Sequence, residues 1–171
     1  NMLKITENVY WDGIQDWDLK LFHGHELSTH RGSTYNSYVI KDEKTVLVDT
    51  VWFPHKETFM KRIEADVGVG NIDMIIIQHN EPDHGGALEA IMEARPDLPI
   101  YCTEFGEKII RAHFHKDWNF KTVKTGDTLE IGDLICAIDD SAAGSTSETP
   151  APDKEKEDKP PKNPEDKPAS R

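Results

Sequence analysis

Four side chains that commonly bind metal ions crowd into the segment HNEPDHGG, residues 79–86. They are His79, Glu81, Asp83 and His84. Imidazole and carboxylate together suit first-row transition metals, and two carboxylates favour iron or manganese, with zinc still compatible. Two imidazole–carboxylate pairs this close could serve two adjacent metal ions, which can act jointly on one substrate. The segment therefore predicts a metal site.

The neighbouring sequence predicts how these side chains are held. IDMIIIQ, residues 72–78, is apolar almost throughout and too short for a helix, which is typical of a strand buried on both faces. GGALEAIMEARPD, residues 85–97, has apolar residues at helical spacing. Binding groups collect beyond the carboxyl ends of such strands. Treating residues 79–83 as extended chain, we expect positions 79, 81 and 83 to point the same way.

A purely structural interpretation of the same residues competes with the metal site. Asp83 could cap the following helix, while His79, Glu81 and His84 could be exposed polar groups of a loop. Their position directly after a buried strand and before two glycines favours the metal site.

The rest of the chain predicts an α/β fold with mixed sheets and helices packed outside them, an α+β sandwich. Segments that alternate apolar and polar residues predict strands and hairpins in 8–14, 19–27, 33–51 and 119–135. The order of elements predicts several antiparallel strands first and then β-α-β-α-β units. Helical spacing predicts further helices over 55–68, ending at Gly68, and over 105–115, with a short strand at 98–104 between helices.

Composition changes abruptly near Cys136, and this predicts two regions. Residues 1–136 mix aromatic, β-branched and charged residues, whereas residues 137–171 are rich in Pro, Lys and Glu and nearly lack large apolar side chains. Such a segment cannot bury enough apolar surface to offset the entropy of ordering it, so we expect a disordered tail.

Charge and cysteine usage narrow the function classes. Acidic residues outnumber basic ones by 32 to 20, for a formal net charge of −12, which disfavours nucleic-acid and membrane-surface binding. No stretch predicts a membrane span or a signal peptide. The two cysteines, Cys102 and Cys136, have no metal-site spacing, and a reducing, cytoplasmic setting fits them. Cys102 is interpreted as a buried strand residue, and the four tryptophans as packing residues.

The motif H-x-E-x-D-H-G-G after an apolar strand resembles the metallo-β-lactamase motif H-x-H-x-D-H with glutamate at its second histidine, the form found in flavodiiron proteins. The segments WDGIQDWDLKLFHG, RGSTYNSYVIKDEKTVLVDTV and WNFKTVKTGDTLEIG extend the resemblance over residues 3–134. The chain thus resembles the amino-terminal half of the metallo-β-lactamase-like diiron domain of a flavorubredoxin-type nitric oxide or oxygen reductase.

The resemblance implies a non-haem diiron centre that reduces nitric oxide to nitrous oxide, or oxygen to water. His79 and Glu81 would bind one iron, Asp83 and His84 the other, and His25 would border the substrate pocket behind the ligands. It also implies FMN in a flavodoxin-like domain, a flavodoxin-like or rubredoxin electron donor, and a homo-oligomer.

The chain departs from the family pattern after residue 134. The family's remaining ligands, a histidine, a bridging aspartate and a final histidine, have no counterpart there, and no FMN-binding domain is present. His113 and His115, the histidines that follow His84, match non-ligand positions. We therefore expect an incomplete metal site that is weakly active or inactive alone.

Two other functions remain open at this stage. One is a metallo-β-lactamase-like hydrolase in which a metal activates water, although Glu81 in place of histidine disfavours it. The other is a non-catalytic fragment or interaction module. Measuring whether the purified protein prefers iron or zinc would distinguish the reductase from the hydrolase. A protein that holds no stoichiometric metal would indicate the interaction module.

Overall fold

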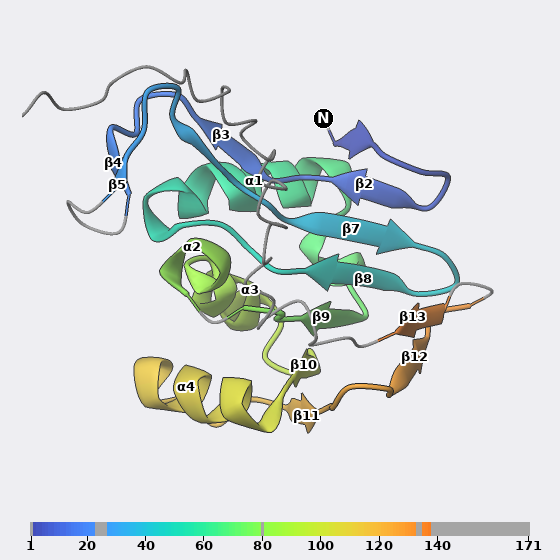
Figure 1. Cartoon of the computed structure of the whole chain (residues 1–171). Helices are drawn as coiled ribbons and strands as arrows, with labels where there is room; N and C mark the ends of the chain where they lie inside the picture. The colour runs from blue at the N-terminus through green and yellow to red at the C-terminus, as the bar shows by residue number, and fades with distance from the viewer. Residues whose placement is uncertain (1, 23–26, 80, 133–134, 138–171) are drawn as a thin grey trace, which may run out of the picture. The chain divides into compact units, whose positions relative to one another are not determined.

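A seven-stranded mixed sheet forms the centre of the computed structural model, which describes residues 2–22, 27–79, 81–132 and 135–137 (Figure 1). The strand order is β1-β2-β7-β8-β9-β10-β11. These strands are β1 (Leu3–Lys4), β2 (Val9–Trp11), β7 (Tyr38–Lys41), β8 (Thr45–Val48), β9 (Met74–Ile76), β10 (Ile100–Cys102) and β11 (Phe120–Thr122).

The connections explain why the sheet is mixed. From β1 to β8 neighbours pair antiparallel, and β7 joins β8 through a tight turn in which the Asp42 amide donates to the Lys44 carbonyl over 3.1 Å. From β8 to β11 neighbours pair parallel, which requires crossover connections. Helices lie in each crossover: η1 (Phe53–His55) and α1 (Lys56–Asp66), then α2 (Pro82–Gly85) and α3 (Leu88–Ala94), then α4 (Glu104–Phe114).

Smaller elements complete the described chain. Short pairs of strands are formed by β3 (Ile14–Asp16) with β6 (Ser33–Tyr35), β4 (Leu21–Phe22) with β5 (Leu27–Ser28), and β12 (Thr128–Glu130) with β13 (Ile135–Ala137), and η2 (Val69–Asn71) precedes β9. No helix in the described ranges is long and apolar enough to cross a membrane.

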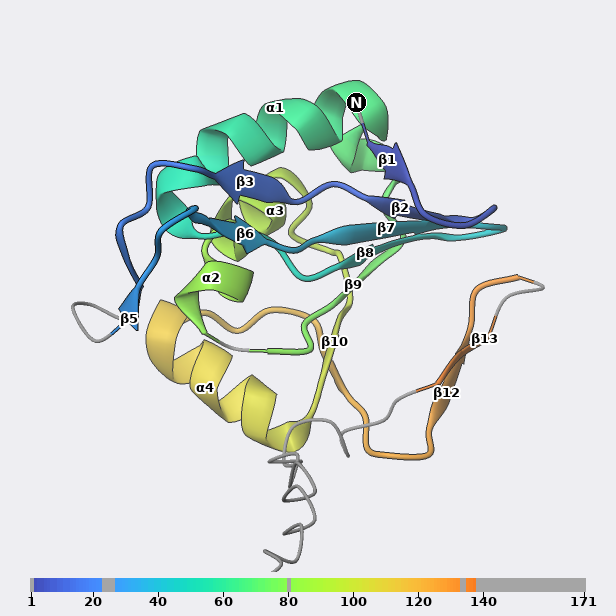
Figure 2. The same ribbon diagram turned by 45° about the horizontal axis from the view of Figure 1, so that its top comes forward.

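Side chains that alternate along β8 and β9 divide the core between the two faces of the sheet. Leu47 and Ile75 pack on the helical side, in a cluster that contains Phe59 of α1 and Ile91 of α3. Residues on either side of them along both strands, such as Val46, belong to a second cluster with Ile131 beside β12. Figure 2 shows α1, α3 and α4 apart from the β12–β13 hairpin.

The predicted α/β architecture is confirmed, and so are the expected helices at 55–68 and 105–115. Gly68 ends α1 as predicted: its amide donates to the Ile63 carbonyl, and its φ of +79° is a conformation that glycine adopts without strain. The expected tail, residues 137–171, lies outside the described residues apart from Ala137.

An ion pair fastens α1 to the end of β2. Asp12 is fully buried, Arg62 Nη2 lies 2.7 Å from its Oδ1, and Arg62 Nη1 donates to the Gly13 carbonyl over 2.7 Å. Within the described chain neither Asp12 oxygen accepts a hydrogen bond of good geometry. Burial therefore outweighs the Arg62 charge and raises the pKa of Asp12 from 3.8 to about 6.

This raised pKa predicts that the chain gains stability on mild acidification. Between about pH 4 and pH 6, Asp12 is protonated in the folded state and ionised in the unfolded state. The free energy of unfolding therefore decreases as pH rises through that range. From pH 7 to pH 5 we expect Asp12 to contribute about 1 kcal/mol of added stability, since one pKa unit corresponds to about 1.4 kcal/mol. Urea unfolding of wild type and Asp12→Asn at both pH values measures it.

The difference between the two proteins isolates Asp12 from all other titrating groups. The exposed Asp18→Asn variant is the matched control and should keep the wild-type pH dependence. Equal pH dependence in wild type and Asp12→Asn would show that Asp12 is charged in both the folded and the unfolded state.

Candidate metal site

The predicted ligands lie on the connection between β9 and α3, beyond the carboxyl end of a buried strand. His79 and Glu81 precede α2, and the Glu81 backbone is extended, with φ −72° and ψ 154°. Asp83 and His84 lie inside α2, where the His84 amide donates to the Glu81 carbonyl over 2.9 Å. The expectation of extended chain through residue 83 is wrong, because Pro82 begins a helical turn.

This helical turn sorts the four side chains into two pairs. His79 Nε2 lies 3.4 Å from Glu81 Oε1, and His84 Nε2 lies 3.5 Å from Asp83 Oδ2. The two imidazole rings meet edge to face, with centroids 5.2 Å apart. The structure thus brings the four predicted residues together as adjacent imidazole–carboxylate pairs. The alternative in which Asp83 caps the following helix is not seen, since α3 begins after Ala87 without a side-chain cap and Asp83 lies inside α2.

A fifth residue, Asp49, holds the His84 ring in place. Asp49 directly follows β8, and its Oδ2 lies 3.2 Å from His84 Nδ1. Its Oδ1 accepts a hydrogen bond from the Gln78 amide over 2.8 Å, and its carbonyl accepts one from Ser37 Oγ over 2.9 Å. A carboxylate on one imidazole nitrogen orients the other nitrogen for a metal. The sequence reasoning missed Asp49, although its position after a buried strand was a usable signal.

The contact with Asp49 also changes the electrostatics of His84. The hydrogen bond that Asp49 accepts from the His84 ring raises the pKa of His84 above its usual value, burial acts in the opposite direction, and the charges of Asp49, Asp83 and Glu81 raise it further. The ring is thus surrounded by negative charge, as a group that shares its site with a cation would be.

Thr50 fixes the backbone of the site. Its amide and its Oγ1 each donate to the His84 carbonyl over 2.7 Å, and Oγ1 accepts from the Ala87 amide over 3.1 Å. Gly86 is needed for this close approach, because a Cβ there would lie 2.3 Å from the Phe53 amide nitrogen. Of the two glycines after the ligand segment, Gly86 is therefore required by close packing against Phe53, and Gly85 is not.

An apolar cavity of about 350 Å³ opens beside the paired ligands. Its walls come from the segment after β3, from the residue before η1 and from α2, and they comprise Leu19, Leu21, Phe22, Trp52, Glu81, Pro82 and Asp83. Trp52, interpreted as a packing residue, does pack against the core and also lines this cavity. Glu81 and Asp83 are the carboxylates that reach it.

Asp16 ties the walls of this cavity together. Its Oδ1 accepts from the backbone amides of Asp18 and Leu19, both over 3.1 Å. Its Oδ2 accepts from the Tyr35 hydroxyl over 3.3 Å and lies 3.0 Å from His55 Nε2. Burial acts to raise the pKa of Asp16, but the hydrogen bonds from His55 and from the Asp18 amide outweigh it and hold that pKa below its usual value.

The described residues do not by themselves form a complete metal site. Within the described ranges, no three His, Cys, Asp or Glu side chains converge so that they could hold a metal ion. His113 and His115 lie at the end of α4 and take part in no such group of described residues. His25 lies outside the described residues. Cys102 is buried, which raises the pKa of its thiol to about 11, as expected for a structural cysteine.

Comparison with known proteins decides the family. The model of the metallo-β-lactamase superfamily matches residues 30–167. The chain belongs to the metallo-β-lactamase superfamily. This membership agrees with the mixed sheet and the helices that pack on it.

Curated relatives carry the resemblance further. The anaerobic nitric oxide reductase flavorubredoxins of Vibrio vulnificus and Salmonella typhi are 46% and 48% identical over 131 and 130 residues. These matches cover 76% and 75% of the chain but 26% and 27% of the relatives, so the chain spans about a quarter of their length.

Solved structures agree with this resemblance. Rubredoxin oxygen:oxidoreductase from Desulfovibrio gigas matches with a TM-score of 0.74 and 38% identity over 79% of the chain and 34% of that protein. The flavodiiron protein of Giardia intestinalis matches with a TM-score of 0.73 and 29% identity, over 79% and 33%. The predicted resemblance to flavodiiron proteins is confirmed.

The role of Asp49 predicts a measurable change at His84. Replacing Asp49 with Asn removes the carboxylate that raises the His84 pKa, so the His84 pKa should fall towards its usual value. Asn tolerates the Asp49 φ of 53°, so the backbone should be preserved. Proton NMR titration of the His84 ring in the metal-free protein measures the shift.

Asp73→Asn is the matched control. Like Asp49, Asp73 accepts a hydrogen bond from a backbone amide: its Oδ2 lies 2.7 Å from the Thr45 nitrogen. Asp73 itself directly precedes β9. This variant should leave the His84 titration where it is in wild type. An unchanged titration in Asp49→Asn would contradict the orienting role of Asp49.

Proposed function

We propose that the chain supplies part of a non-haem diiron centre that reduces a diatomic gas, nitric oxide to nitrous oxide or oxygen to water. The observation that carries the proposal is the apolar cavity bounded by Glu81 and Asp83, each carboxylate paired with an imidazole. A small neutral molecule loses little hydration when it enters such a cavity. Inside, it lies next to the carboxylates of Glu81 and Asp83.

The ligand pairs divide between two metal ions. His79 and Glu81 would hold one iron, and Asp83 and His84 the other, with Asp49 keeping His84 Nε2 directed to the metal side. Imidazole and carboxylate oxygen are suitable donors for iron. Two bound irons would supply electrons to the gas. Each pair offers only two donors, so tight binding needs further ligands beyond these four residues.

The chain's own residues also shape the surroundings of the reaction. Leu19, Phe22 and Trp52 would exclude water from the gas. Asp16 would hold Leu19 in place through its backbone amide, and it would hold Tyr35, whose ring lies against Trp52. His25 would border the same pocket, as the family resemblance implies.

The names of the relatives support a proposal for the source of the electrons. The Desulfovibrio gigas protein is named a rubredoxin oxygen:oxidoreductase, and the curated relatives are named flavorubredoxins. We infer FMN in a flavodoxin-like domain, a flavodoxin-like or rubredoxin electron donor, and a homo-oligomer. A cytoplasmic location fits the buried free thiol of Cys102.

A metal-dependent hydrolase is the second candidate. It would share the fold and a bound metal that activates water. The cavity beside Glu81 argues against it, since its described lining contains no lysine or arginine that could hold an anionic substrate. The third candidate, a non-catalytic interaction module, predicts no dependence of metal binding on the four residues.

Anaerobic calorimetric titration of the chain with ferrous iron tests the ligand assignment. We expect binding that weakens by about tenfold or more in Glu81→Gln and in Asp83→Asn, because even residues behind the ligands change affinity by about 10–100-fold. Glu89→Gln, which removes a carboxylate on α3, is the control and should bind like wild type. Equal affinities in all variants would overturn the assignment.

A second measurement separates the reaction classes. The iron-loaded chain, supplied with reduced FMN, should at most weakly consume nitric oxide beyond the rate that the same flavin shows without protein, because its site lacks further ligands, and Glu81→Gln should remove this difference. The hydrolase instead predicts tighter zinc binding and hydrolysis of a β-lactam by the zinc-loaded chain. A preference for zinc together with β-lactam hydrolysis would contradict the proposed role, whereas iron binding with little or no turnover is expected of a site that lacks its further ligands.

A further inference from the structure

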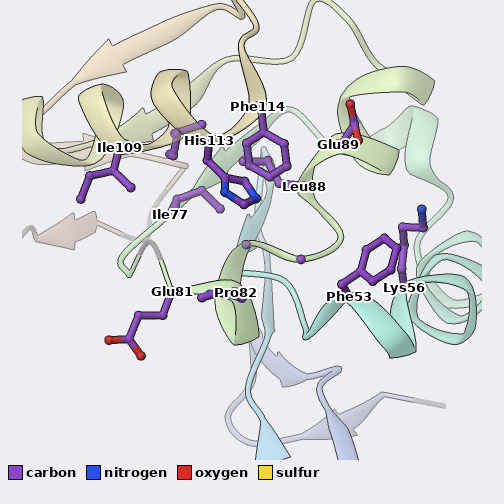
Figure 3. A pocket seen from close by; sticks show the side chains of 13 residues that line it. Phe53, Lys56, Ile77, Glu81, Pro82, Leu88, Glu89, Ile109, His113 and Phe114 are labelled. Carbon is purple, nitrogen blue, oxygen red and sulfur yellow. The ribbon is translucent and has the colours of Figure 1, made fainter. Parts of the chain in front are cut away.

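A second and larger cavity, of about 530 Å³, lies between α2 and α4 (Figure 3). Glu81 and Pro82 line both cavities. Asp83, Leu19 and Trp52 line only the smaller one. The volume of the larger cavity falls in the range of about 300–1,000 Å³ that is typical of small-molecule sites. Neither the proposed diiron centre nor the core packing accounts for it.

The floor and walls of the larger cavity are apolar. Ile77, Leu88 and Ile110 line it and are almost completely buried, and Phe53 and Phe114 also line it. Figure 3 shows Leu88, His113 and Phe114 together on one side and Phe53 with Lys56 on the other. An apolar body of a ligand would gain free energy by covering these walls, at about 25 cal/mol per Å² of buried apolar area.

The rim carries one lysine, Lys56, and two carboxylates, Glu89 and Glu81, each of which has a cationic or imidazole partner of its own. Glu89 is engaged by Lys116, whose Nζ lies 3.7 Å from its Oε1. Glu81 Oε1 lies 3.4 Å from His79 Nε2, and Figure 3 shows the Glu81 carboxylate directed away from the other lining side chains. Lys56 Nζ lies 4.8 Å from the centre of the Phe53 ring and is the lysine of the rim.

We propose that this cavity binds a small organic anion with an apolar body, such as an aromatic or branched aliphatic carboxylate. The apolar body lies against Leu88 and Phe114, and the anionic group faces Lys56, with the His113 ring as a further hydrogen-bonding group. An ammonium group beside an aromatic ring suits an aromatic anion in particular, because the ring edge and the charge are contacted together.

Gly85 provides a direct way to fill the cavity. It lines the cavity, and a Cβ at this position would have no heavy atom within 4 Å. A larger side chain there therefore enters open space instead of clashing with backbone. Gly86, which also lines the cavity, cannot be used because its Cβ would collide with the Phe53 amide.

The probe for the test is 1-anilinonaphthalene-8-sulfonate, an aromatic anion that fluoresces when it binds apolar sites. Its uncharged counterpart, N-phenyl-1-naphthylamine, is the matched probe without the anionic group. We expect wild type to bind the anion at one site, and Gly85→Leu to weaken binding by about tenfold or more. Gly70→Leu is the control, because a Cβ at Gly70 also has no atom within 4 Å but lies outside the cavity.

Lys56→Gln tests the anionic part of the proposal separately. It should weaken the anionic probe by about fivefold, the effect of one partly exposed ion pair, and leave the neutral probe unchanged. Equal effects on both probes would show that the cavity binds apolar molecules without charge selection and would overturn the proposed ligand class.

Two further measurements show whether the variants fold and where the probe binds. Gly85→Ala adds a single methyl group in open space and should fold like wild type, with intermediate probe affinity. Methyl NMR signals of Ile77 and Ile110 should shift when the probe binds wild type and should not shift in Gly85→Leu. Wild-type affinity in Gly85→Leu, or probe binding without these shifts, would show that the probe binds elsewhere.

Discussion

The two hydrogen bonds from Thr50 to the His84 carbonyl hold the site in its place in the fold. They join the residues after β8 to α2, the four-residue turn that carries Asp83 and His84. A helix this short has no stability of its own, because one turn closes too few hydrogen bonds to offset the entropy of ordering it. Its conformation therefore comes from its attachment to the sheet.

The same attachment determines both cavities, because α2 forms a wall of each. Pro82 lines the larger and the smaller cavity, whereas Asp83 reaches only the smaller and Gly85 only the larger. Any movement of α2 relative to β8 would change the two spaces together. The close approach of α2 to η1 at Gly86 restricts such movement, since there is no room there even for a methyl group.

Much of the fold follows from local sequence patterns, and the parts that do not have identifiable reasons. Strands and helices around 38–48, 56–66 and 104–114 were predictable because apolar spacing and turn residues agree there. The turn α2 was missed because four residues show no periodicity. Asp49 was missed because a single aspartate after a strand forms no motif, and its contact with His84 exists only once β8 and β9 pair. Both cavities depend on side chains from distant segments.

The charge arrangement explains why the four predicted ligands stand as pairs. Asp49, Glu81 and Asp83 gather around His84, and the repulsion between carboxylates that this entails is destabilising unless positive charge compensates it. These carboxylates raise the pKa of His84 because they stabilise a proton on its ring. A metal ion between the pairs would supply more charge and displace the proton, so the same crowding that opposes the metal-free state favours the cation. The pairing of each imidazole with a carboxylate therefore supports the proposed metal site.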